Sequence, residues 1–167
     1  MPDNIEAMIT YFSTQPPDQV VQGLRAMKQD ATDILAWADQ MLAADAEAHA
    51  IALLQDGLGE LSKHPDRIAA DTNLMGAWVR LFRLLSKNGR NQEAIQAYFM
   101  AESLGNDDPM DKLVLATDLH AVGRYREALK IADTLLATKP RFDPEMMSPE
   151  HALALAREVK ADCMRHI

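Results

Sequence analysis

Apolar residues recur along most of this chain at spacings of three and four, which places them on one face of an α-helix. Two short stripes of this kind stand near the N-terminus, one on each side of Pro16-Pro17: Ile5, Met8, Ile9 and Phe12, then Val20, Val21 and Leu24. No segment shows the strict alternation of apolar and polar residues that is typical of a half-buried strand. The pattern therefore predicts an all-α fold.

From about residue 31 onward, the predicted helices come in pairs. The predicted parts of the chain are an N-terminal helical extension, three helix pairs and a C-terminal capping helix: 1–30, then 31–64, 75–108 and 109–142, then 143–167. Between the first two pairs, residues 66–73 form either a polar connection or an extra turn of helix.

Three signals mark where these helices end and begin. Gly105 is expected to end its helix in the left-handed conformation, which glycine adopts without steric cost. Asp108-Pro109 and Ser148-Pro149 each combine a capping side chain with a proline in the first helical turn.

A gapless repeat links the second and third pairs. Residues 88–95 align with residues 122–129, so that Gly89 and Gly123 stand 34 residues apart. A period of this length is typical of helix–turn–helix units that stack into a solenoid, because one unit cannot bury its apolar face alone. The repeat predicts that nine residues are buried: Trp78, Phe82, Leu85, Ala94, Tyr98, Leu115, Leu119, Ala128 and Ala132.

The repeated residues resemble the tetratricopeptide repeat (TPR). The resemblance rests on ten positions: Trp78, Leu81, Gly89, Ala94, Tyr98 and Ala101, with Gly123, Tyr125, Ala128 and Pro140. It implies a right-handed solenoid in which the small alanines let paired helices approach closely. The first pair has neither the Gly nor the Tyr of the turn, and Lys112 in the third pair stands where the second has Trp78.

The layout of the whole chain also resembles the class II chaperones of type III secretion. The similarity lies in the length, the acidic charge, the N-terminal extension, three repeats and one closing helix, and in the stretch from 94–101 to Asp107-Asp108-Pro109. Such chaperones hold apolar translocator subunits in the bacterial cytoplasm until export. The resemblance implies a polypeptide partner and homodimerisation through the N-terminal region.

The inner face of the predicted solenoid is expected to bind the partner. Residues one position after the buried stripe would face this groove: Leu35, Asp39 and Leu42 in the first pair, Val79, Arg83 and Ser86 in the second, and Leu113, Thr117 and His120 in the third. In this row the first position of a pair is apolar and polar residues come after it, a pattern that suits a peptide with spaced apolar anchors. The alternative is that these are ordinary solvated positions.

Composition narrows the classes of partner and the compartment. A net charge of −8 would repel nucleic acid and anionic membranes, and no apolar run approaches the ~20 residues that span a bilayer. The single cysteine, Cys163, cannot form an internal disulfide, and the N-terminal residues do not resemble a secretory signal. We therefore expect a cytoplasmic protein without membrane insertion.

Nothing in the sequence indicates catalysis, a cofactor or a metal site. The five histidines are His49, His64, His120, His151 and His166. No two of them are four residues apart, and none has a cysteine at a metal-binding spacing. The sequence also contains no phosphate-binding loop. We predict a non-catalytic module. The alternatives are a scaffold that assembles a cytoplasmic complex and an enzyme whose site is built from residues distant in sequence.

The two N-terminal stripes lack an obvious place in the repeats. Stripes of this kind usually cover an interface, either within one chain or between two. They could cap the first helix pair, or they could form a dimer surface comprising Ile5, Met8, Ile9, Phe12, Val20, Val21 and Leu24. The resemblance to the secretion chaperones favours the dimer.

Overall fold

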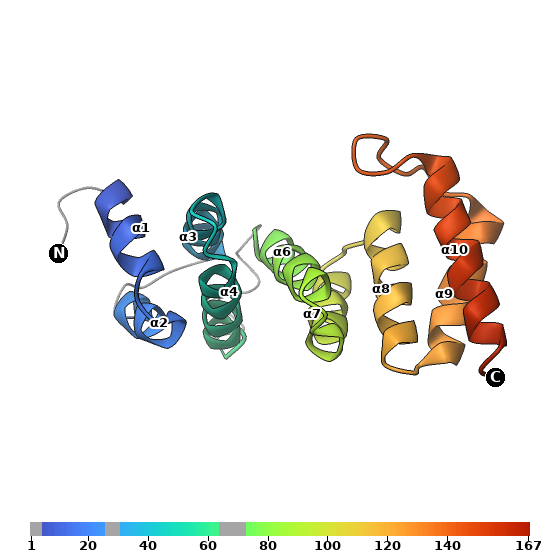
Figure 1. The fold of residues 1–167 in the computed structure, drawn as a ribbon, viewed down its shortest axis with the longest axis horizontal. Coiled ribbons are helices and arrows are strands. Elements are labelled where there is room, and N and C mark those ends of the chain that lie inside the picture. The colour runs from blue at the N-terminus through green and yellow to red at the C-terminus, as the bar shows by residue number, and fades with distance from the viewer. Residues whose placement is uncertain (1–4, 26–30, 64–72) are drawn as a thin grey trace. The chain divides into compact units, whose positions relative to one another are not determined.

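The computed structural model describes residues 5–25, 31–63 and 73–167 (Figure 1). The regular secondary structure in these ranges is helical. These ranges contain nine α-helices and no strand. The prediction of an all-α fold is therefore confirmed. The two alternatives for residues 66–73 concern a segment that, apart from Asn73, lies outside the described residues, and so do 1–4 and 26–30 of the predicted extension.

The chain forms two compact units, Met1–Leu84 and Leu85–Ile167, called unit 1 and unit 2 below. Unit 1 holds five helices, the last of which continues into unit 2: α1 (Ile5–Ser13), α2 (Pro17–Arg25), α3 (Ala31–Ala43), α4 (Glu47–Leu61) and α6 (Leu74–Lys87). Within unit 1, α3 packs along α4, while α1 contacts α3 and α2 contacts α4. The N-terminal helices are thus packed against the first helix pair.

Unit 2 contains the C-terminal end of α6 and four complete helices: α7 (Asn91–Ser103), α8 (Pro109–Ala121), α9 (Tyr125–Thr138) and α10 (Pro149–Met164). α7 packs against α8, α8 against α9 and α9 against α10, and α10 also contacts α8. One face of α8 is therefore covered by both α9 and α10. A cluster that includes Met110, Leu113, Leu135, Phe142 and Ala152 fills this region.

The same turn joins the helices of the second and third pairs. Gly89 and Gly123 adopt φ angles of 69° and 79°, in the left-handed region that favours glycine. The amide that follows each glycine donates to a carbonyl five residues back, Arg90 N to Leu85 O at 2.9 Å and Arg124 N to Leu119 O at 2.8 Å. This bond satisfies a carbonyl at the helix end that has no partner within the helix.

The first pair uses this turn without a glycine. Asp45 takes the left-handed conformation, with φ 55°, and Ala46 N donates to Met41 O at 2.8 Å. A short polar side chain tolerates this conformation better than most residues. The first pair, whose turn lacks the expected glycine and tyrosine, therefore keeps the turn geometry of the other two.

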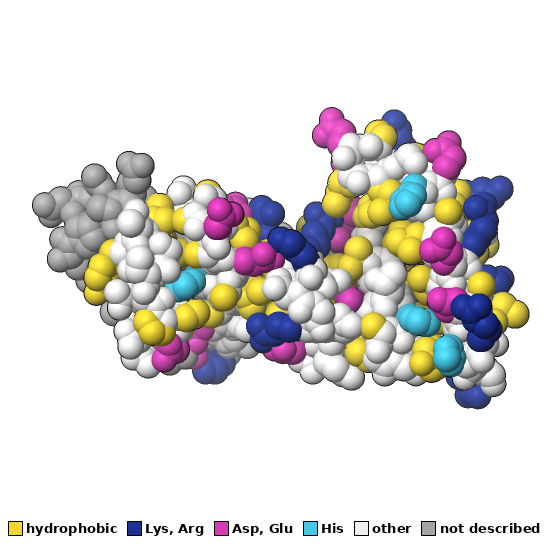
Figure 2. Space-filling model, in the orientation of Figure 1, with side chains coloured by type: hydrophobic (Ala, Val, Ile, Leu, Met, Phe, Trp, Pro, Cys, Tyr) yellow, Lys and Arg dark blue, Asp and Glu magenta, His cyan; other side chains and the backbone are white. Residues whose placement is uncertain are grey.

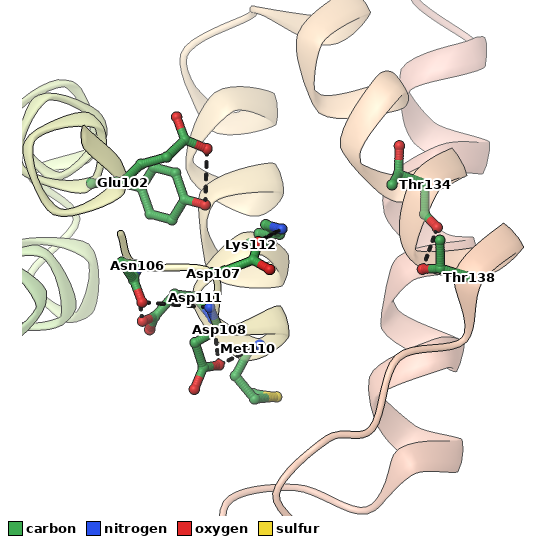
Figure 3. Close-up of polar contacts among 10 residues, drawn as sticks. Glu102, Asn106, Asp107, Asp108, Met110, Asp111, Lys112, Thr134 and Thr138 are labelled. Carbon is green, nitrogen blue, oxygen red and sulfur yellow. Dashed lines mark hydrogen bonds and ion pairs between the residues drawn. The ribbon is translucent and has the colours of Figure 1, made fainter. Parts of the chain in front are cut away.

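The predicted helix signals are confirmed. Gly105 has a φ angle of 104°, and the Asp108 side chain accepts hydrogen bonds from the amides of Met110 and Asp111 at 2.7 and 3.3 Å (Figure 3). Ser148 caps α10 by accepting a bond of 3.3 Å from the His151 amide. A proline stands in the first turn of both helices, as expected.

Eight of the nine residues predicted to be buried are buried: Phe82, Leu85, Ala94, Tyr98, Leu115, Leu119, Ala128 and Ala132. The prediction for Trp78 is wrong, because its side chain is only half-buried. Leu74, Ala77 and Leu81 form the centre of the buried face of α6. Trp78 therefore stands at the edge of that face, where part of its large indole remains in solvent.

Candidate functional site

In unit 1, the residues predicted to line the groove are half-buried or exposed. Four are half-buried: Leu35, Leu42, Val79 and Arg83. Asp39 is exposed and forms an ion pair of 3.0 Å with Arg80 on α6. The apolar members of this row are therefore partly accessible, whereas the carboxylate of Asp39 already has a charged neighbour.

In unit 2, the prediction for Leu113 is wrong. Its side chain is 1% exposed and belongs to the cluster with Leu135 and Phe142. The prediction placed Leu113 on an open face of α8, but α10 covers that face together with α9. Leu113 is therefore a core residue and cannot contact a partner.

The other three predicted groove residues of unit 2 remain half-buried, namely Ser86, Thr117 and His120. Thr117 Oγ1 donates to the Val114 carbonyl at 2.7 Å. The His120 ring packs edge-on against Tyr125, with ring centroids 5.3 Å apart, and Tyr125 stacks on His166 at 4.6 Å. Through these ring contacts, the end of α8 and the start of α9 pack against the residues that follow α10.

Ser86 binds a buried carboxylate that sequence reasoning did not identify. Its Oγ donates to Asp118 Oδ1 at 2.9 Å, and Asp118 is 3% exposed. Burial raises the pKa of Asp118 to about 6, although the bond from Ser86 acts in the opposite direction. Ser86 is therefore occupied within the unit and is less available to a partner than its position in the row suggests.

A cavity of about 300 Å³ lies between α7, α8 and α9 in unit 2. Its walls are apolar and come in pairs from the three helices: Tyr98 and Phe99, Leu115 and Leu119, Ile131 and Leu135. Phe99 is 42% exposed, so an aromatic ring stands partly in solvent beside an apolar hollow. Concave apolar sites with a few polar groups are where ligands most often bind.

Four charged side chains and the hydroxyl of Thr134 surround this cavity. Glu102 comes from α7, Lys112 from α8, and Glu127, Lys130 and Thr134 from α9, and Figure 3 shows Glu102, Lys112 and Thr134 on their three helices. Lys112 forms an ion pair with Asp107. Glu127 accepts two hydrogen bonds from Arg124, at 2.7 and 2.6 Å, and this hydrogen bonding lowers the pKa of Glu127.

The Tyr98 hydroxyl is a further polar group of the cavity wall. It donates to Glu102 Oε1 at 3.5 Å (Figure 3). Burial, helped by the carboxylates of Glu102, Asp111 and Asp107, raises the pKa of Tyr98 above its ordinary value. The phenol therefore stays protonated at neutral pH and remains a hydrogen-bond donor.

One sequence signal pointed toward the cavity without identifying it. Lys112 occupies the position that Trp78 has one repeat earlier, and Lys112 lines the cavity. Leu115 and Leu119 were predicted to be buried, and both are. Their role as a cavity floor depends on how three helices meet, which the pattern of a single helix does not contain.

The residues of the predicted dimer surface are partly buried inside unit 1. Phe12 and Val20 are 8% and 2% exposed, and the Phe12 ring meets Trp37 of α3 edge-on with centroids 6.1 Å apart. Ile9 and Val21 are half-buried. The side chains of Ile5, Met8 and Leu24 lie outside the described residues, and dimerisation stays a prediction.

Within the described residues, no group of three or more His, Cys, Asp or Glu side chains could hold a metal ion. No helix in that same part is long and apolar enough to cross a membrane. Figure 2 shows acidic and basic side chains interspersed over α9 and α10. Comparisons of this chain with known protein families, with curated proteins and with solved structures found no match.

Proposed function

We propose that this chain is a non-catalytic protein-interaction module that holds a polypeptide partner. Its helix pairs would stack as a right-handed TPR-like solenoid, with the N-terminal helices at one end and α10 at the other. The repeated turn supports this arrangement. Beyond the glycines, each turn is followed by the same ion pair, Arg90–Glu93 and Arg124–Glu127, both with N···O distances of 2.6 Å.

The cavity of unit 2 is the observation that carries the proposal. It offers apolar walls, a partly exposed Phe99 ring and a charged rim, the combination that binds one apolar side chain of a peptide. The half-buried residues of the predicted groove are proposed as further contacts, each within its own unit: Val79 and Arg83 in unit 1, and Thr117 and His120 in unit 2.

The more specific form of the proposal follows from the resemblance noted above. It is a chaperone that keeps an apolar translocator of a type III secretion system soluble in the bacterial cytoplasm, acting as a homodimer. The alternative is a cytoplasmic TPR scaffold. The two differ in the partner: an apolar export substrate in the first case, a stable set of cytoplasmic proteins in the second.

Affinity capture from the native cells, followed by mass spectrometry and purification of the complex, tests the function. Ile131→Asp would place a carboxylate in the apolar wall of the cavity, and we expect it to weaken capture at least tenfold. Ala137→Asp is the matched control, because it adds the same charge to an exposed position of α9 outside the cavity. Arg83→Glu tests the groove residues of unit 1, and Thr117→Glu tests those of unit 2.

Each outcome decides a different part of the proposal. Loss of the partner with Ile131→Asp alone assigns the contact to the cavity, and loss with the groove variants alone moves it to the predicted groove. A partner that is retained by every variant, or no reproducible partner at all, would contradict polypeptide binding at these surfaces. Circular dichroism of each variant shows whether the helices are intact.

A further inference from the structure

The charges at the rim of the unit 2 cavity are not equivalent, because only some of them already have partners. Lys112 is paired with Asp107, and Glu127 is paired with Arg124. Within the part of the chain that the structure describes, Lys130 on α9 has no ion pair. Among the same described residues, the Glu102 carboxylate on α7 accepts only the long bond of 3.5 Å from Tyr98. The rim therefore presents one available cation and one available anion.

These two charges come from helices that form opposite walls of the cavity. Lys130 belongs to α9, Glu102 belongs to α7, and α8 contributes Leu115 and Leu119 between them. An acidic group near Glu102 would be repelled, and the same group near Lys130 would be attracted. The rim thus favours one orientation of a charged ligand over the opposite one.

The cavity has room for a single anchor. Its volume of about 300 Å³ is at the lower end of ligand sites, so it suits one bulky apolar side chain and not a longer apolar segment. Residues that flank such an anchor on the partner would lie at the rim. Their charges, and not the anchor alone, would then determine which sequences bind.

We propose that the cavity binds a polypeptide segment whose bulky apolar side chain stands between an acidic and a basic residue, with the acidic residue at Lys130 and the basic one at Glu102. This rests on the proposed function and adds the sequence and orientation of the bound segment. The ligand is recognised by charge complementarity at both rims and by burial of the anchor between them.

Three blocked tripeptides test this directly: acetyl-Glu-Phe-Lys-amide, acetyl-Lys-Phe-Lys-amide and acetyl-Glu-Phe-Glu-amide. Binding to the full chain is measured at low salt by chemical-shift titration. We expect the unsubstituted protein to prefer Glu-Phe-Lys by about two- to fivefold per matched charge, the range of exposed ion pairs. Lys130→Glu leaves two anions and should prefer Lys-Phe-Lys, while Glu102→Lys leaves two cations and should prefer Glu-Phe-Glu.

The controls separate this proposal from the function on which it rests. Ile131→Asp should weaken all three peptides, and Ala137→Asp should weaken none. If all three proteins rank the peptides identically while Ile131→Asp still abolishes binding, the charge rule is wrong and the cavity remains an anchor site. If no peptide binds, or if Ile131→Asp has no effect, the cavity does not take a polypeptide anchor and the proposal is overturned, whatever the native capture shows.

Discussion

Ser86, in the last turn of α6, donates a hydrogen bond of 2.9 Å to Asp118 in α8, and this bond is the one described contact of a carboxylate that solvent hardly reaches. The second oxygen, Oδ2, is buried and has no hydrogen-bond partner within the described residues. A charge in this position is costly, because one bond replaces only part of the lost hydration. The consequence is a pKa for Asp118 of about 6, against an ordinary 3.8.

The stability of the protein should therefore rise as the pH falls from 7 toward 5. Between about pH 4 and 6 the folded state holds a proton on Asp118 that the unfolded state has lost, so stability decreases as pH increases through this window. Asp118→Asn should flatten this slope, with a difference on the order of 1–3 kcal/mol between the ends of the window. Urea unfolding at pH 7, 6, 5 and 4 measures it.

Other groups also titrate in this range, so the relevant quantity is the difference in slope between the two proteins. Equal slopes for the unsubstituted chain and Asp118→Asn would show that Asp118 has an ordinary pKa. Ser86→Ala provides a second check. Because the bond from Ser86 lowers the pKa of Asp118, its removal should raise that pKa further and steepen the slope.

Leu113→Asp should unfold or strongly destabilise unit 2. Leu113 is buried among Leu135 and Phe142, and an unpaired carboxylate placed there costs roughly 3 kcal/mol or more. Ala137→Asp, exposed on α9, should change the free energy of unfolding by less than about 0.5 kcal/mol. Thermal melts followed by circular dichroism compare the two. If Leu113→Asp melts cooperatively at the melting temperature of the unsubstituted chain, Leu113 is not a core residue and belongs to the predicted groove.

The local features of this fold were predictable from the sequence, because short-range chemistry determines them. Gly89 and Gly123 marked the turns, and Asp108 and Ser148 marked the helix starts, each through a preference that acts within four residues. The left-handed conformation of Asp45 was not predicted, since nothing nearby in the sequence requires an aspartate to adopt it.

Features that depend on several helices were predicted poorly. Leu113 was placed on an open face by counting along α8, but α10, more than 30 residues later, covers that face. The cavity likewise requires α7, α8 and α9 together, and only the replacement of a tryptophan by Lys112 hinted at it. Helical periodicity identifies which residues share a face and does not say which neighbour covers it.

The left-handed glycines should not tolerate a side chain. Gly123→Ala should destabilise the protein by about 1–2 kcal/mol, because its φ of 79° is unfavourable for any residue with a Cβ, although the space around it is open. Gly59→Ala is the control, since this glycine lies inside α4 with open space and without a positive φ. We expect Gly59→Ala to stabilise by about 0.5–1 kcal/mol. Chemical denaturation of both measures the difference, and effects of equal sign would contradict this account of the turn.

Close packing of α3 on α4 requires the small residue at position 57. A Cβ on Gly57 would lie 2.5 Å from Ile34 Cδ1 and 2.8 Å from Ile34 Cγ1, closer than real contacts allow. Gly57→Ala should therefore cost about 1–3 kcal/mol through overpacking, despite the better helix propensity of alanine. Adding Ile34→Val removes Cδ1 and should restore part of the loss. A stabilising effect of Gly57→Ala, similar to that expected for Gly59→Ala, would mean that the two helices are further apart.

The side chains of α1 can distinguish packing within one chain from pairing between two chains. Packing within the chain depends on its buried side chains, whereas pairing depends on its exposed ones. Phe12 is 8% exposed and meets Trp37, so Phe12→Ala should lower the stability of unit 1 by about 2–4 kcal/mol. Tyr11, its neighbour, is 52% exposed and is available to a second chain. Tyr11→Asp should therefore leave the melting temperature of a dilute sample unchanged.

Sedimentation equilibrium of the same variants decides the dimer. If α1 pairs two chains, Tyr11→Asp should shift the mass toward the monomer, because it places a charge in the interface, and an Asp at the exposed Ala137 should not. If the mass of Tyr11→Asp equals that of the unsubstituted chain while Phe12→Ala melts early, α1 is a cap of its own unit. The N-terminal stripe then serves the fold, and dimerisation, if it occurs, uses another surface.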